Sequence, residues 1–239
     1  MITEAYASIN STARLAGGLY LAMAPFNVFG IIYVPSALTV HGDAAATSRN
    51  IMTSEWFFRS GTLIHLVGQI MFVFLVLALY RLLKTVNKEH ATLMVVLALL
   101  GVPMAFLNEV NHLAVLQLLG SADTGAFTSS QFQAQAMLFL DMRESGIRLT
   151  QIFWGIWLLP LGVLVFRSGF LPRVLGILLA IAGAGHLIDV GTQLMSPGFA
   201  TISQFTWVGE LLFPLWLLIK GVNVDRWQQV TLARSVPSR

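Results

Sequence analysis

The chain has 239 residues, of which 56% are hydrophobic and only 10% are charged, and its formal net charge is +3. Soluble globular domains average about 25% charged residues. The mean hydropathy of +0.75 therefore excludes an ordinary soluble domain and indicates a polytopic helical membrane protein. Cysteine is absent, which excludes disulfides, thiolate metal ligands and thiol nucleophiles together. Any chemistry must use histidine, carboxylates, arginine or hydroxyl groups.

Six apolar stretches are long enough to cross a bilayer, which takes roughly 17 to 25 residues. They are predicted at residues 14–34, 60–82, 91–118, 144–166, 173–195 and 201–220. These stretches are continuous and rich in Leu and Ala, whereas the strands of a membrane barrel alternate apolar and polar residues. We therefore expect an all-α fold, with residues 1–239 forming a single transmembrane domain of six helices in one bundle.

The basic residues predict the orientation, because cytoplasmic loops of membrane proteins are enriched in Lys and Arg. With both termini in the cytoplasm, 10 of the 14 basic residues lie on the inner side: Arg14, Arg81, Lys84, Lys88, Arg167, Arg173, Lys220, Arg226, Arg234 and Arg239. Arg49, Arg59, Arg143 and Arg148 then lie outside or near the outer face. The pI of 9.6 reflects this bias and contact with anionic lipid headgroups, and it gives no indication of nucleic-acid binding.

The predicted outer loops are longer than the inner ones. The inner connection Arg167–Arg173 reads as a tight helical hairpin in which Pro172 suits the start of the next helix. The outer connection between the first two spans runs from Pro35 to Arg59. Before the fourth span, residues 128–130 are good helix N-caps. We expect an amphipathic helix over about residues 130–143 on the outer surface.

Four segments carry a resemblance to a known family: GDAAATSRNIMTSEWFFRSG, LALYRLLKTVN, FRSGFLPRVLGILLAIAGAGHLID and LWLLIKGVN. Together they resemble the pattern of the bacterial DUF4386 family of multi-span membrane proteins. The resemblance covers roughly Thr12 to Asn223, and FRSGFLPRVLG is its most specific part. It implies a six-span protein of the bacterial plasma membrane. Because the family name denotes an unknown function, the resemblance implies no catalytic residues.

Polar residues interrupt the outer third of the third predicted span, at Asn108, Glu109, Asn111 and His112. Glu109 and His112 are three residues apart, so on a helix they share a face. A Glu followed by His at this spacing occurs twice in di-iron carboxylate bundles. A single copy fits equally well the polar end of a helix at the membrane interface.

The fourth predicted span carries Asp141, Glu144, Arg148 and Gln151 at spacings of 3, 4 and 3. This spacing forms one stripe, which we expect to point into the bundle because lipid would not solvate it. Glu144 and Arg148 are predicted to form an i,i+4 ion pair. Alternatively, Arg148 receives a carboxylate or phosphate of a substrate.

The fifth predicted span carries a second polar stripe, formed by His186, Asp189 and Gln193 and preceded by the small-residue run AGAG, which permits close helix approach. Asp189 is expected to orient the imidazole of His186 or to share a metal ion with it, and the alternative is a hydrogen bond of helix packing. In the sixth span, Glu210 has no Lys or Arg within one turn, so it is expected to be protonated or paired across helices.

His65 and Gln69 share one face of the second predicted span, where a lone histidine also fits a simple packing role.

Under the predicted topology the ionisable residues come from five spans and share the outer half of the bilayer, which predicts an outward-facing polar cavity. The candidate catalytic residues are Glu109, His112, His186, Asp189 and Glu210. The candidate substrate-binding residues are His65, Gln69, Asn108, Asn111, Glu144, Arg148, Gln151, Gln193 and Trp207.

Three classes of function remain open. In an enzyme, Glu210 or Glu109 would protonate a small lipophilic substrate while His112 or His186 accepts a proton. In a metal-dependent variant, iron, zinc or manganese would be held by oxygen and imidazole ligands from Glu109, His112, His186, Asp189 and Glu210. Haem bound by two of the intramembrane histidines is a further alternative.

The second class is a proton-coupled transporter, and the third is a ligand-binding sensor that signals through a partner chain. The expected partners are the lipid bilayer and a small lipophilic ligand. The sequence indicates no particular cofactor and no particular oligomeric state.

Overall fold

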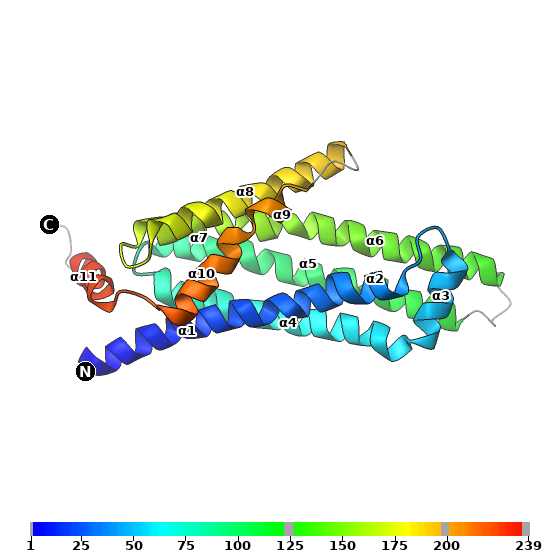
Figure 1. Ribbon diagram of the computed structural model, residues 1–239, viewed down its shortest axis with the longest axis horizontal. Coiled ribbons are helices and arrows are strands. Elements are labelled where there is room, and N and C mark those ends of the chain that lie inside the picture. The colour runs from blue at the N-terminus through cyan, green and yellow to red at the C-terminus, as the bar shows by residue number, and fades with distance from the viewer. Residues whose placement is uncertain (1, 122–126, 197–200, 236–239) are drawn as a thin grey trace. The chain divides into compact units, whose positions relative to one another are not determined.

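The computed structural model describes residues 2–121, 127–196 and 201–235, and within these ranges it is helical and contains no β-strand (Figure 1). The all-α prediction is confirmed. The elements are α1 (Ile2–Asn27), the π-helix η1 (Val28–Tyr33), α2 (Val34–Leu38), α3 (Ala44–Thr53), α4 (Glu55–Leu83), α5 (Lys88–Gly120), α6 (Ser129–Ile156), α7 (Leu158–Arg167), α8 (Arg173–Met195), α9 (Ser203–Thr206), α10 (Val208–Ile219) and α11 (Val224–Ser235).

Several of these segments are long and apolar enough to cross a membrane. Within the described residues, five satisfy this condition by themselves: Ile9–Leu38, Glu55–Leu83, Lys88–Gly120, Ser129–Arg167 and Arg173–Met195. A sixth arises only if Ser203–Ile219 and Val224–Ala233, which are bent by 98° at their junction, count as one span. Large apolar side chains such as Leu63, Phe74 and Leu107 are exposed on these helices, as expected of surfaces that face lipid.

The segments between the predicted spans contain additional helices. The connection after the first span includes α3, which begins where Asp43 Oδ1 accepts a hydrogen bond from the backbone N–H of Ala46 at 2.8 Å. Helix α6 begins at Ser129, and Thr128 Oγ1 accepts a hydrogen bond from the backbone N–H of Gln131 at 3.3 Å. Helix α6 ends at Ile156, four residues before Pro160, which has no N–H to bond the Ile156 carbonyl.

Residue contacts group the chain into two compact units. Unit 1 comprises Met1–Ala22, Met71–Gly101 and Gln151–Arg239. Unit 2 comprises Met23–Ile70 and Val102–Thr150. The divisions fall inside α1, α4, α5 and α6, so each of these helices contributes residues to both units.

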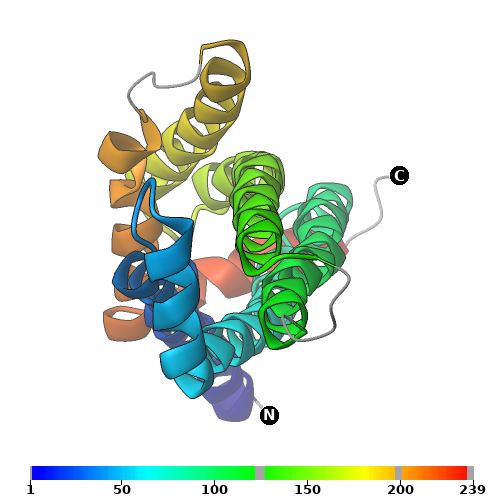
Figure 2. The same ribbon diagram turned by 90° about the vertical axis from the view of Figure 1, so that its right-hand side faces the viewer.

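In unit 1, α7 and α8 form a tight hairpin, and α9 and α10 return along α8 (Figure 2). Gly169 turns the hairpin with a φ of 72°, and Pro172 is the N-cap of α8, as expected from the sequence. A Cβ atom added to Gly183 would lie 2.7 Å from the carbonyl oxygen of Gly155. The prediction that the AGAG run permits close helix approach is therefore confirmed.

In unit 2, a hydrophobic core joins the first helical segments to α5 and α6. Its buried members are Val34, Leu38, Ile51, Phe58, Val115, Leu116, Leu119 and Ala136. The π-helix η1 brings Gly30 against α4, where an added Cβ would lie 2.6 Å from the carbonyl oxygen of Gly61 and 2.7 Å from His65 Cβ. This close approach places the backbone of η1 beside the polar residues of α4, and π-helical turns occur frequently at functional sites.

Candidate functional site

The carboxylate of Glu109 is the centre of a buried polar cluster in unit 2. Its side chain is 2% exposed, and that of Arg143 is 4% exposed. Arg143 Nη2 and Nε donate to Glu109 Oε1 at 2.7 Å and 3.2 Å, and Nη2 also donates to the carbonyl oxygen of Gly30 at 3.1 Å. The pair thus holds two opposite charges away from solvent, and removing either residue would leave the other charge buried without compensation.

His65 contacts Glu109 and Gln69 through its two ring nitrogens. Its Nδ1 lies 2.7 Å from Glu109 Oε1, and its Nε2 lies 3.2 Å from Gln69 Nε2. An ionised carboxylate only accepts hydrogen bonds, so His65 Nδ1 carries the proton, and the amide of Gln69 donates to Nε2. Both nitrogens of His65 are therefore occupied, which agrees with a positioning role.

Thr62 determines how His112 is hydrogen-bonded. Thr62 Oγ1 donates to Glu109 Oε2 at 3.1 Å and lies 2.7 Å from His112 Nδ1. A hydroxyl group has one hydrogen, and that of Thr62 is used in the hydrogen bond to the Glu109 carboxylate. Thr62 Oγ1 therefore accepts a hydrogen bond from the Nδ1–H of His112. The other ring nitrogen, His112 Nε2, is buried and has no hydrogen-bond partner in the described residues. Its lone pair therefore accepts no hydrogen bond from the described residues.

We refer to Thr62, His65, Glu109, His112 and Arg143 as the Glu109 cluster. Glu109 and His112 also approach each other directly, with His112 Nδ1 lying 3.4 Å from Glu109 Oε2. The prediction that these two residues share a face of one helix is confirmed. His65 and Gln69 also meet, as expected from their spacing.

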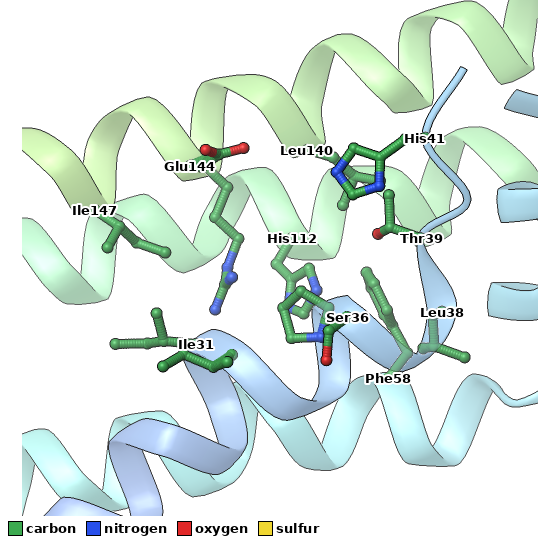
Figure 3. A pocket seen from close by; sticks show the side chains of 13 residues that line it. Ile31, Ser36, Leu38, Thr39, His41, Phe58, His112, Leu140, Glu144 and Ile147 are labelled. Atoms are coloured by element: carbon green, nitrogen blue, oxygen red, sulfur yellow. The ribbon is translucent and has the colours of Figure 1, made fainter. Parts of the chain in front are cut away.

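A cavity of about 350 Å³ adjoins the Glu109 cluster within unit 2 (Figure 3). It is lined by Ile31, Ile32, Pro35, Ser36, Leu38, Thr39, His41, Phe58, His112, Leu140, Arg143, Glu144 and Ile147. His41 and Glu144 are exposed, whereas His112 and Arg143 are buried, so the cavity extends from the surface of unit 2 to its buried polar groups. The rings of His112 and Phe58 lie with their centroids 3.7 Å apart. This volume is at the lower end of the range for small-molecule sites.

A second, smaller polar cluster lies in unit 1 and consists of Tyr20, His186 and Glu210. The Tyr20 hydroxyl donates to Glu210 Oε2 at 3.1 Å, and His186 Nε2 lies 3.0 Å from Glu210 Oε1. Glu210 was expected to be either protonated or paired across helices, and its pairing across helices is confirmed. His186 Nδ1 is buried and, within the described residues, has no hydrogen-bond partner.

Asp189 does not contact His186 as expected from the sequence. Its Oδ1 accepts from the backbone N–H of Ile202 at 2.5 Å, and its Oδ2 accepts from that of Ser203 at 2.9 Å. Asp189 therefore satisfies backbone groups at the start of α9, which would otherwise lack partners. The prediction that Asp189 orients the His186 imidazole is wrong, because Glu210 takes that position.

Three of the four residues of the stripe predicted on the fourth span, Asp141, Glu144 and Arg148, do not point inward. The Glu144 and Arg148 side chains are 69% and 42% exposed, and Asp141 is also exposed. The predicted ion pair between Arg148 Nη1 and Glu144 Oε1 is present at 2.5 Å. The side chain of Arg143 is buried instead, because its positive charge compensates the negative charge of Glu109.

The remaining candidate residues have varied surroundings. In unit 2, Asn108 Nδ2 donates to the carbonyl oxygen of Arg143 at 2.8 Å, and Asn111 Nδ2 donates to Asn108 Oδ1 at 3.2 Å. In unit 1, Gln151 and Gln193 each have a buried Oε1 without a partner among the described residues. Trp207 is 48% exposed.

The proposed metal ligands are divided between the units: Glu109 and His112 belong to unit 2, and His186, Asp189 and Glu210 belong to unit 1. Within the described ranges, no set of three or more His, Cys, Asp or Glu residues is arranged to hold a metal ion. Glu109 instead pairs with His112 and Arg143, and Glu210 pairs with His186.

Sequence reasoning did not select Thr62, Tyr20 or Arg143 as site residues. Thr62 lies three residues before His65, so helical periodicity could have placed both on one face. Arg143 could have been found from charge balance, because a buried Glu109 requires a cation. Tyr20 is 190 residues from Glu210, and no local signal connects the two.

The fold and the polar clusters define a multi-pass helical membrane protein with buried His and Glu residues. Within that class the chain belongs to the DUF4386 family, whose model, described as "Domain of unknown function (DUF4386)", matches residues 15–221. The resemblance seen in the sequence is thus confirmed.

A relative from Archaeoglobus fulgidus, described as "Uncharacterized protein", is 47% identical to this chain over 74 residues. The match covers 30% of this chain and 44% of that protein, so the chain spans less than half of the relative's length. No solved structure matches this chain.

Proposed function

We propose that the protein is a membrane enzyme that binds a small lipophilic substrate in the unit 2 cavity and uses His112 as a general base. The observation that supports this proposal is the unpartnered Nε2 of His112, on a residue that lines the cavity. A general base must reach the proton it abstracts and must be held in one orientation. Thr62 and Glu109 contact the other ring nitrogen of His112, Nδ1, and so hold the imidazole in one orientation.

The arrangement resembles the orienting half of a catalytic triad, in which a carboxylate fixes the tautomer of a histidine. Here Thr62 lies between the imidazole and the carboxylate at hydrogen-bond distance from both. When His112 takes a proton, the adjacent carboxylate of Glu109 stabilises the imidazolium that forms. Arg143 would stabilise negative charge that develops on the substrate.

The proposal includes a location in the bacterial plasma membrane, with both termini in the cytoplasm. The excess of Lys and Arg at the ends of the spans expected to face inward supports this orientation. In that topology the unit 2 cavity faces the outer leaflet, because Thr39 and His41 lie in the connection after the first span. A lipophilic substrate would enter it from the outer leaflet or the outer surface.

The enzyme proposal is tested by incubating purified protein in nanodiscs with a total bacterial lipid extract and comparing lipid profiles by mass spectrometry. We expect a species that the natural protein consumes and that His112→Asn leaves unchanged. Asn places an amide N–H near the position of Nδ1 and deletes the Nε2 side of the ring. The proposal is wrong if the natural protein alters no species, or if His112→Asn alters the same species at the same rate.

Proton-coupled transport is the second candidate, and the cluster of Tyr20, His186 and Glu210 favours it. The pair of His186 and Glu210 can share a proton, and His186 Nδ1 offers a second nitrogen that no described residue occupies. Intramembrane carboxylate and histidine pairs occur in proton relays. Proteoliposomes that contain a pH-sensitive dye test this candidate. Substrate-driven acidification that persists in Glu210→Gln would exclude a relay through this pair.

A further inference from the structure

Two residues at the buried end of the unit 2 cavity carry polar atoms that the described residues leave free. The acceptor is His112 Nε2, which is buried, has no hydrogen-bond partner among the described residues and belongs to a residue that lines the cavity. The donor is Arg143 Nη1, because the hydrogen bonds of Arg143 to the described residues use Nε and Nη2. Both residues line the cavity. A complementary ligand therefore has a polar head that donates one hydrogen bond and accepts another.

The rest of the lining is mainly apolar and its charges are balanced. Ile31, Leu38, Phe58, Leu140 and Ile147 are among the cavity residues. The charge of Arg143 is compensated by Glu109 within the cluster, and Glu144 at the exposed end is paired with Arg148. His41 is the remaining titratable residue in the lining, and His65 contacts the far side of Glu109.

This charge balance determines the form in which an acid could bind. An anion that entered alone would add an uncompensated charge to an apolar cavity, which costs several kcal/mol. A carboxylic acid that enters in its neutral form avoids this cost. Its O–H can donate to His112 Nε2, and its carbonyl oxygen can accept from Arg143 Nη1.

We infer that the ligand of the unit 2 cavity is a lipophilic monocarboxylic acid, bound between His112 Nε2 and Arg143 Nη1. This inference rests on the proposed function of the cavity. On binding, the acid keeps its proton: its O–H donates to Nε2 and its carbonyl oxygen accepts from Nη1, so no covalent bond breaks and the cavity gains no charge. A cavity of about 350 Å³ holds on the order of ten non-hydrogen atoms at roughly 30 Å³ each, which fits a medium-length chain.

The test uses decanoic acid labelled at the carboxyl carbon, titrated into nanodiscs of phosphatidylcholine that contain the full chain. Carbon NMR separates bound from free acid, and empty nanodiscs measure partition into lipid. We expect a bound carboxyl-carbon signal that requires the protein. His112→Asn and Arg143→Lys should each weaken binding by about tenfold or more, because each removes one of the two hydrogen bonds to the carboxyl group. Arg143→Lys keeps the positive charge next to Glu109, so the carboxylate is not left without compensation.

His90→Asn is the matched control, because His90 lies in unit 1 and its ring contacts Asn87. It should bind decanoic acid as the natural protein does. Equal binding by natural protein and His112→Asn would overturn the inference, and so would the absence of a protein-dependent carboxyl-carbon signal. Titration with decanol distinguishes the two proposals. If decanol binds more tightly than decanoic acid and its binding requires His112, the ligand is not a carboxylic acid, whereas the proposal that the cavity binds a lipophilic substrate stands.

Discussion

The guanidinium of Arg143 in α6 donates to the carboxylate of Glu109 in α5 at 2.7 Å, although these residues are 34 positions apart in the chain. This contact explains how unit 2 retains a carboxylate beside two histidines without an uncompensated charge. It also orders the site, because Glu109 in turn contacts His65, Thr62 and His112.

Replacing Glu109 by Ala should strongly destabilise the protein. Arg143 would then be a buried cation without a partner, and losing one member of a buried ion pair costs about 3–5 kcal/mol. Unfolding of the protein in mixed micelles with increasing denaturing detergent measures this loss. Glu144→Ala is the control, since its exposed pair with Arg148 contributes at most about 1 kcal/mol. Equal destabilisation by the two variants would contradict the buried ion pair.

Gly30→Ala should separate η1 from α4. The added Cβ would lie 2.6 Å from the carbonyl oxygen of Gly61, and a backbone atom cannot move aside as a flexible side chain can. Overpacking of this kind costs typically about 1–3 kcal/mol, and it would also displace the Gly30 carbonyl from Arg143. The midpoint of thermal unfolding should fall. Gly120→Ala, where no atom lies within 4 Å of the added Cβ, should leave this midpoint nearly unchanged.

Tyr20→Phe should remove one hydrogen bond to Glu210 and preserve the ring contact with Trp157. A hydrogen bond to a charged group contributes roughly 1.5–3 kcal/mol. The loss should depend on Glu210, so a double-mutant cycle of Tyr20→Phe with Glu210→Gln should give a coupling energy clearly different from zero. Tyr33→Phe, at an exposed tyrosine, provides the comparison. Additive effects of Tyr20→Phe and Glu210→Gln would argue against the contact.

Asp189→Ala should release the start of α9. The two backbone N–H groups of Ile202 and Ser203 would lose their acceptor, and the loss of such a cap costs about 0.5–2 kcal/mol. Hydrogen exchange at these two amides should accelerate, whereas exchange in α7 should not change. In the control variant Asp141→Ala, at an exposed position of α6, both amides should exchange as slowly as in the natural protein. Unchanged exchange in Asp189→Ala would show that water or another group satisfies them.

Local relationships in the site were accessible from the sequence because helical periodicity is a local property. Glu109 with His112, His65 with Gln69, and Glu144 with Arg148 are three or four residues apart, and each pair meets in the structure. Pro172 and the AGAG run likewise act through their immediate helical surroundings. Spacing predicts such neighbours without any knowledge of which helices pack together.

The sequence by itself determined the class of protein, because apolar runs of this length can satisfy their backbone polar groups in a bilayer only as helices. It did not determine which face of α6 turns inward. Neighbouring residues on a helix differ by about 100° in direction, so burying Arg143 turns the stripe of Glu144 and Arg148 outward. That choice depends on the carboxylate of Glu109 in another helix, just as the partner of His186 depends on where α10 places Glu210. Only the tertiary structure decides such pairings, since the compensating charge comes from a distant part of the chain.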